Sequence, residues 1–457
     1  MHMKKISGKL NRREFVKAGS MTALGLVLGG CAKNPVTGQS QFMLINEADE
    51  IKLDKQASPQ QLSNDYGPTQ DTELNKYVSG VGHSLAATTH RPNMPYSFRV
   101  VNANYINAYA FPGGTIACTR GIMLEVDNEA ELAALLGHEL GHVNARHTAS
   151  RMSSQAVIGT LAGVGGAVIG SKYGSGWGAL AGGVAGFGVG ALLASYSRDD
   201  ERQADSLGMQ YMTSAQYNPD GMIGLMDMLN EQHTKEPSAL EVMFATHPMS
   251  SERLATARKT ANTKYLGAKE YSIYRERYMD NTASLRKIAP AVKELQTAEK
   301  LMAKKKYGEA EEHIQTALKT APEDYAGLML MSKCQIAQNK LDKGQTYAGR
   351  AREAYPSEAQ AMQLNGLLLV KNERYAAAFD NFSDYDQALP GNPYTAFFRG
   401  YSLEGMGRTR DAAQLYIQFL RQVNQGEQAQ YAYNRLVEWG YIRGEAGPAT
   451  DPFAGLA

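Results

Sequence analysis

Apolar residues first recur at helical spacing near residue 71, in the stretch "DTELNKYVSGVGHSLAATT". They are Leu74, Tyr77, Val78, Val81 and Leu85. The pattern then becomes β-like in "YSFRVV" and "NYINAYAF", stops at Pro112, Gly113 and Gly114, and resumes in "TIACT". Two β-prone runs around a Pro-Gly-Gly turn predict a hairpin. The chain here therefore predicts a helix followed by a small β-hairpin or sheet.

A second helix is predicted from Asp127 or Asn128 to about His147, with the acids Glu129 and Glu131 in its first turn. Its apolar face is formed by Leu132, Leu135, Leu136 and Leu140. A long apolar stretch follows at 156–194, in which glycines are spaced four apart. Such spacing lets another helix press closely against the chain. Three interpretations stay open: a lid or plug over a site, a hairpin that enters a membrane or partner, and a tightly packed core hairpin.

The last third of the chain repeats every 34 residues. Small residues (Ala310, Gly344, Ala378, Ala412) and prolines (Pro322, Pro356, Pro390) recur with this period. A small residue allows two helices to approach closely, and proline ends the second helix. The pattern is typical of tetratricopeptide repeats. It predicts four units over roughly 290–423 and a capping helix in "EQAQYAYNRLVEWGYI".

Net charge and cysteine content serve mainly to exclude certain partners and kinds of site. The 47 basic and 46 acidic residues leave no strong net charge, which argues against nucleic acid as a partner. The three cysteines are Cys31, Cys118 and Cys334, with no CxxC pair, so neither a disulfide framework nor a thiolate metal site is indicated. We expect Cys118 and Cys334 to be buried thiols.

Residues 1–30 read as a targeting segment, with a basic start and an apolar run too short to span a bilayer. "NRREFVK" at 11–17 resembles a twin-arginine export signal, and "LGGC" at 28–31 resembles a lipobox that would make Cys31 a lipidated N-terminus. Ala32 then favours the outer membrane. The alternative is an ordinary secretory signal with a chance cysteine.

The strongest chemical motif is "GHELGHVNARH" at 137–147. His138 and His142 are four residues apart on one helix, so both imidazoles project from the same face. This spacing suits two nitrogens that bind one Zn²⁺, and Glu139 is placed to contact a water molecule there. His147 lies about 140° further round the helix and therefore points away from the metal. We expect it to cap the helix or to hold a neighbouring carboxylate.

A third ligand is predicted in "YSRDDERQADSLG" at 196–208. Glu201 and Asp205 are again four apart, so the glutamate can bind zinc while the aspartate accepts the N–H of a ligating histidine. His247, in "FATHPMSSERL", has two open roles. It either donates a hydrogen bond to the oxyanion of a tetrahedral reaction intermediate, or it binds zinc as a fourth ligand and closes the site.

Together, "INAYAFPGG", "GHELGHVNARH", "ERQAD" and "THPMSSER" resemble the zinc metallopeptidase family that includes Oma-type mitochondrial proteases and CAAX prenyl proteases. The BepA-like branch, a periplasmic peptidase with a C-terminal tetratricopeptide domain, is the nearest match. The resemblance implies that Asn107, Ala108, Tyr109 and Ala110 form an edge strand that pairs with the substrate backbone. It also implies that the histidine at 247 can occupy the zinc and keep the enzyme latent.

We therefore expect a mainly α protein: an α+β peptidase domain with a small sheet, then a helical tetratricopeptide solenoid. The expected segments are a signal (1–30), a tether (31–65), the peptidase domain (66–270), a linker (271–289), the repeats (290–442) and a tail (443–457). The expected function is a zinc endopeptidase, with one Zn²⁺ per chain, acting on misfolded or stalled envelope proteins. The repeats would bind these substrates and envelope assembly proteins. The alternative is an envelope-tethered scaffold or chaperone with a structural or silent zinc site.

Overall fold

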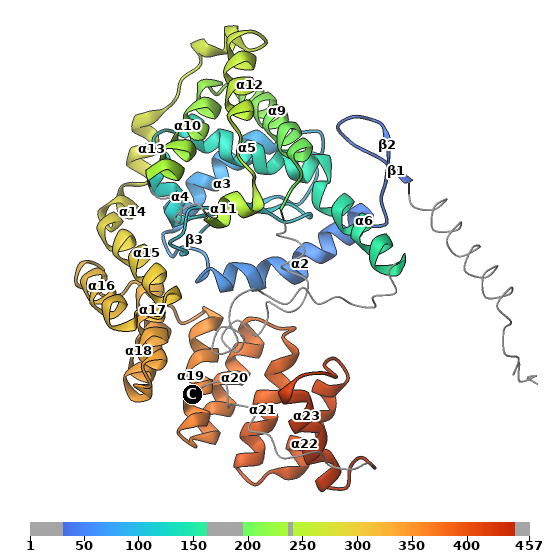
Figure 1. Cartoon of the computed structure of the whole chain (residues 1–457), viewed down its shortest axis with the longest axis vertical. Coiled ribbons are helices and arrows are strands. Elements are labelled where there is room, and N and C mark those ends of the chain that lie inside the picture. The colour runs from blue at the N-terminus through green and yellow to red at the C-terminus, as the bar shows by residue number, and fades with distance from the viewer. Residues whose placement is uncertain (1–30, 162–194, 236–240, 444–457) are drawn as a thin grey trace, which may run out of the picture.

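The computed structural model describes residues 31–161, 195–235 and 241–443, and it is mainly helical (Figure 1). An N-terminal body lies above a curved array of helix pairs, and the long helix α2 (Glu47–Asn64) runs between them. The signal segment and most of the glycine-rich stretch lie outside the described residues. Among the residues described, no helix is long and apolar enough to cross a membrane.

The centre of the N-terminal body is helix α5 (Glu129–Ala145), and all residues of α5 are buried. It begins where the Asn128 side chain accepts the backbone N–H of Glu131, and it ends at Arg146, whose φ of 60° is left-handed. The predicted continuation to His147 is therefore wrong, because the chain turns at Arg146 and His147 begins α6 (His147–Leu161).

A three-stranded sheet packs beside α5. Its strands are β3 (Ser97–Val101), β4 (Ala108–Ala110) and β5 (Thr115–Thr119), in the order β3-β5-β4. The predicted hairpin is confirmed, since β4 pairs antiparallel with β5 across the Pro-Gly-Gly turn. β3 joins β5 in parallel.

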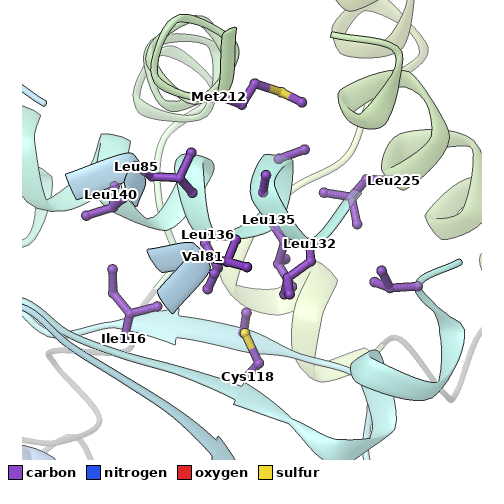
Figure 2. Packing of buried hydrophobic residues seen from close by; sticks show 14 of the residues in the cluster. Val81, Leu85, Ile116, Cys118, Leu132, Leu135, Leu136, Leu140, Met212 and Leu225 are labelled. Atoms are coloured by element: carbon purple, nitrogen blue, oxygen red, sulfur yellow. The ribbon is translucent and has the colours of Figure 1, made fainter. Parts of the chain in front are cut away.

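The apolar core lies between this sheet and the helices around α5 (Figure 2). Leucines of α5 meet residues of α3 (Thr72–Ala86) and β5 on one side, and of α9 (Arg198–Ser214) and α10 (Asp220–Lys235) on the other. Cys118 belongs to this core, and Cys334 is buried in the repeats, as predicted.

Three glycines allow α5 and α9 to pack closely. A Cβ on Gly141 would lie 2.9 Å from the backbone of Ala204, and one on Gly208 would lie 2.8 Å from the backbone nitrogen of His138. Gly137 faces Gly208 at the same crossing. The two helices that carry the predicted ligands therefore approach backbone to backbone, which brings His138 and His142 close to Glu201.

The segment expected to be a tether is folded. Strands β1 (Cys31–Lys33) and β2 (Ser40–Phe42) form a hairpin, and α2 follows. Glu50 of α2 accepts hydrogen bonds from Arg91 and Arg146, while Asp54 accepts the backbone N–H of Thr115. These contacts hold α2 across the β4–β5 turn.

The segment expected to be a linker also folds onto the body. It contains α13 (Arg275–Asn281) and α14 (Ala283–Lys287), and Tyr278 is fully buried with its hydroxyl donating to the carbonyl of Met123. The remaining elements of the body are α4 (Arg120–Glu125), α11 (Glu241–Thr246), α12 (Ser251–Asn262) and the short 3-10 helix η2 (Leu266–Glu270).

The repeat helices follow the predicted period. The second helices of the pairs begin at Tyr307, Leu341, Tyr375 and Thr409, each 34 residues after the last. The pairs are α15 (Ala289–Ala303) with α16 (Tyr307–Thr320), α17 (Tyr325–Ala337) with α18 (Leu341–Ala354), α19 (Ala359–Lys371) with α20 (Tyr375–Ala388), and α21 (Pro393–Gly405) with α22 (Thr409–Leu420). The capping helix is α23 (Glu427–Glu438).

Charged side chains join the repeats to the body, and we call this contact the domain seam. Arg120 of α4 pairs with Asp324, at 2.5 Å, and also donates to Asn104. Asn104 in turn donates to Glu299 of α15. Further along, Ser63 of α2 donates to Glu358 at the start of α19. These hydrogen bonds and the ion pair hold the repeats against the N-terminal body.

Candidate metal centre

Four side chains from three parts of the chain converge beside the α5–α9 crossing. One donor atom each of His138, His142, Glu201 and His247 lies within 4.8 Å of all the others. His138 and His142 come from α5, Glu201 from α9, and His247 from the residue that follows α11. All four are buried. The structure thus brings together the three predicted ligands and His247, for which two roles were left open.

The spacing of these atoms fits a metal ion. His138 Nε2 lies 3.1 Å from His142 Nε2 and 3.3 Å from His247 Nδ1. Glu201 Oε1 lies 3.0 Å from His247 Nδ1 and 3.3 Å from His142 Nε2. Tetrahedral zinc with ligands at about 2.0–2.1 Å requires ligand atoms about 3.3 Å apart. Imidazole and carboxylate are also donors that zinc accepts, so the residues present fit this ion.

Glu139 lies next to the cluster. Its side chain is fully buried, and within the described parts of the chain neither carboxylate oxygen has a hydrogen-bond partner. Burial raises the pKa of Glu139, and the nearest imidazole nitrogen, His247 Nε2, is 3.7 Å from Oε1. A buried carboxylate without partners is costly, so this position has the character of a reactive group.

Asp205 supports His138 as predicted. Its Oδ1 lies 3.0 Å from His138 Nδ1, the ring nitrogen opposite the cluster. Arg253 of α12 donates to both oxygens of Asp205, at 2.6 and 2.7 Å, and its Nη1 lies 2.6 Å from Glu201 Oε2. Burial alone would raise the pKa of Asp205, but the hydrogen bonds from Arg253 and His138 hold it below its usual value.

Arg253 was not given a role from the sequence, although a signal was present. Glu201 and Asp205 project from one buried helix face, and two buried carboxylates require a cation. Arg253 forms ion pairs with both carboxylates, and these ion pairs also hold α12 against α9.

His147 is not a member of the cluster, as predicted, but it does not cap α5. Its Nδ1 lies 2.9 Å from Nδ1 of His142, and its Nε2 lies 2.9 Å from Oε1 of Gln203. The expected carboxylate neighbour is Asp200, at 3.5 Å. Tyr196 stacks on the His142 ring, with centroids 3.7 Å apart. Burial lowers the pKa of both His142 and His147.

The predicted substrate strand lies at one edge of the sheet. Ala108, Tyr109 and Ala110 form β4, and Asn107 precedes it. Their side chains are buried, and the Tyr109 hydroxyl donates to Asp65 at 2.5 Å. Ala110 and Phe111, at the end of β4, line a small cavity together with His142 and Tyr196.

Comparison with known proteins identifies the scaffold that carries this cluster. Residues 72–261 match the model of peptidase family M48. The chain carries an M48 peptidase domain. Residues 301–365 of the M48 chain match a tetratricopeptide repeat model. The predicted family and fold class are thereby confirmed.

Individual relatives agree with this assignment. The beta-barrel assembly-enhancing protease of Yersinia pestis is 28% identical over 345 residues, or 71% of each protein. The protein of the same name from Escherichia coli K12 is 27% identical over 194 residues, which are 42% of this chain and 40% of that protein. The mitochondrial metalloendopeptidase OMA1 of Schizosaccharomyces pombe is 26% identical over 178 residues, half of that protein. The chain is thus homologous to metallopeptidases, and the expectation that it belongs to this class of enzyme is confirmed.

Proposed function

We propose that the chain is a zinc-dependent endopeptidase in which His138, His142 and Glu201 hold the metal and Glu139 is the general base. The observation that carries the proposal is Glu139, whose buried carboxylate has no hydrogen-bond partner in the described residues and adjoins four converging donor atoms. A purely structural zinc site has no use for such a group. A hydrolytic site requires one.

The chemistry divides between metal and protein. Zinc, when bound, supplies positive charge that acidifies a water molecule and polarises the scissile carbonyl. Glu139 accepts a proton from the attacking water on a carboxylate oxygen and then donates it to the nitrogen of the leaving amine. Arg253 and Asp205 keep Glu201 and His138 oriented.

His247 gives the proposed enzyme a latent form. Its Nδ1 is one of the four converging donor atoms, so in this arrangement it takes the fourth position of a tetrahedral shell. Movement of His247 away from the cluster would leave that position to water and substrate. In that second arrangement its ring would be available to donate to the oxyanion.

Envelope proteins that are misfolded or stalled in assembly are the proposed substrates. The names of the bacterial relatives refer to beta-barrel assembly. The tetratricopeptide repeats would bind such substrates and envelope assembly proteins. Strand β4 pairs with β5 on one side only among the described strands, which supports its role in pairing with a substrate backbone through Asn107–Ala110.

We propose a periplasmic location, with twin-arginine export and a lipid on Cys31 that anchors the chain to the outer membrane. Asn34, three residues later, is buried and donates to the carbonyl of Ala145, so an anchor at Cys31 would hold the peptidase body close to the lipid surface. A Cys31→Ser variant that still fractionates with the outer membrane would contradict this anchor.

The competing function is a tethered scaffold or chaperone whose zinc is structural. The same four-donor arrangement favours it, because a closed shell is typical of structural zinc. Under that function, loss of Glu139 leaves the cellular role intact.

Digestion of unfolded casein separates the two functions. The test uses the purified chain from residue 31 with Cys31→Ser, beside its Glu139→Gln variant. We expect cleavage by the first and a loss of at least about 10²-fold in the second, with zinc still bound by both. If neither cleaves, His247→Ala should activate a latent peptidase. A silent His247→Ala variant with bound zinc would refute the peptidase.

A further inference from the structure

The two ligating histidines of α5 are supported in different ways on the side away from the metal. His138 Nδ1 faces the carboxylate of Asp205, which Arg253 neutralises. His142 Nδ1 instead faces a second imidazole, that of His147, and His147 faces the side-chain amide of Gln203. This second chain of contacts takes no part in the chemistry proposed above.

The direction of the hydrogen bonds in that chain follows from Gln203. Its Oε1 is a carbonyl oxygen and can only accept, so Nε2 of His147 must carry a proton. In a neutral imidazole the other nitrogen is then an acceptor, which makes Nδ1 of His147 accept the N–H of His142 Nδ1. His142 therefore has its proton on Nδ1 and a free lone pair on Nε2, the atom that belongs to the donor cluster.

The turn between α5 and α6 is what makes this contact possible. Arg146 adopts a left-handed φ of 60°, so the chain reverses after α5 and the first residue of α6, His147, lies back against His142. Arg146 is itself held by Glu50, at 3.0 Å. Gln203 is delivered from α9, two residues after Glu201.

We propose that Gln203 and His147 are positioning residues that fix the metal-binding tautomer of His142 and thereby set the affinity of the site for zinc. This inference rests on the proposed metal site. A neutral acceptor suits the position, because the buried carboxylates of Glu139 and Glu201 lie close by and the carboxylate of Asp200 is 3.5 Å from the same nitrogen of His147. Groups that orient a ligating histidine typically change metal affinity by about 10- to 100-fold when they are removed.

The test is the zinc dissociation constant of the full M48 chain, measured by competition with a chromogenic chelator. Gln203→Leu removes the nearer acceptor of His147 Nε2, at 2.9 Å, and leaves the Asp200 carboxylate 3.5 Å away, so it should weaken zinc binding roughly 10- to 100-fold. Gln203→Glu keeps an acceptor oxygen at the same reach and should stay within about threefold of the parent chain. Gln210→Leu, on the same helix and likewise half-buried, is the matched control and should bind as the parent does.

Two changes at His147 provide a second, independent arm. His147→Phe keeps the ring but has no acceptor, so we expect a loss as large as that of Gln203→Leu. His147→Asn retains an amide oxygen near the position of Nδ1 and should recover most of the affinity. Thermal unfolding of each metal-free variant checks that the fold is retained.

The outcomes separate the inference from the proposed function. Weak binding by Gln203→Leu and His147→Phe, with recovery in Gln203→Glu and His147→Asn, supports the positioning role. Equal affinity in all variants, or equal loss in the Leu and Glu variants, overturns it while leaving the zinc site intact. If the parent chain binds no stoichiometric zinc, the proposed function fails first.

Discussion

The metal centre and the domain seam both bury charge, but they treat it differently. At the seam, Arg120 pairs with Asp324, and Glu299 accepts a hydrogen bond from Asn104. At the metal centre, imidazole nitrogens face one another and the carboxylate of Glu139 has no hydrogen-bond partner in the part of the chain described. Paired charges stabilise the way two units dock. Burial of a carboxylate that has no hydrogen-bond partner in the described residues is costly, and such a residue at a metal centre indicates a role in the reaction.

The largest effect is expected from Arg120→Met at the seam. The change leaves Asp324 buried without its cation, although the charge of Arg120 normally holds the pKa of that carboxyl below its usual value despite burial. Removal of one partner of a buried pair costs about 3–5 kcal/mol. Urea unfolding of the full chain measures it as a lowered midpoint.

The double variant Arg120→Met/Asp324→Leu tests the cause, because replacement of both partners by apolar residues is often nearly neutral. We expect it to recover most of the loss. Lys306→Ala breaks an exposed pair with Glu309 and serves as the control, with a cost below about 1 kcal/mol. A double variant no better than the single one would mean that Arg120 acts through packing rather than charge.

A smaller effect, dependent on pH, is expected at Glu358 in the seam, a carboxyl that forms no ion pair with any of the described residues. Burial raises the pKa of Glu358 from 4.5 to about 7 in the folded chain. The folded state therefore prefers the protonated form, and its contribution to stability is complete below pH 4.5 and is lost as pH rises through 7. The loss amounts to about 3 kcal/mol at pH 8.

Glu358→Gln should remove this dependence, because the amide oxygen can still accept from Ser63. The variant and the parent should unfold alike near pH 4, and the variant should be the more stable by up to about 3 kcal/mol at pH 8. Glu309→Gln, at an exposed site, is the control. Parallel pH curves for Glu358→Gln and the parent would exclude Glu358 as the source.

The smallest effect is expected at Glu139 in the metal centre, where a substitution should stabilise the fold rather than destabilise it. It therefore tests the difference between the metal centre and the seam directly. Glu139→Met in the metal-free chain removes two buried oxygens without hydrogen-bond partners in the described residues, so it should raise the free energy of unfolding by about 1–3 kcal/mol. Activity should be lost at the same time. Such a trade between stability and function is expected where a strained site is retained for its chemistry.

Glu50→Met is the matched comparison for this change. Glu50 is as buried as Glu139, but it accepts hydrogen bonds from Arg91 and Arg146. Its loss should destabilise the chain by about 3–5 kcal/mol, because the buried Arg146 loses its carboxylate partner and the buried Arg91 keeps the exposed Glu47 alone among its carboxylate partners in the described residues. If Glu139→Met and Glu50→Met shift stability in the same direction, the distinction between the two kinds of buried charge is wrong.

Local sequence patterns were sufficient to predict several helices and one hairpin of this protein. The four-residue spacing of His138 and His142, the same spacing of Glu201 and Asp205, and the 34-residue period of the repeats all follow helix geometry. The β4–β5 hairpin follows from turn chemistry at Gly113 and Gly114. In each case the signal is a spacing or a turn motif within the chain itself, so the sequence alone carries it.

Contacts between distant segments were decided only by the tertiary structure. His247 meets His138 across 109 positions, Arg253 meets Asp205 across 48, and His147 meets Gln203 across 56. Likewise, α2 and α13 proved to be parts of the body, because their buried contacts are with residues far along the chain. Periodicity determines which face of a helix is buried, but it does not determine what that face meets. In this protein the close α5–α9 crossing at Gly141 and Gly208 makes that choice.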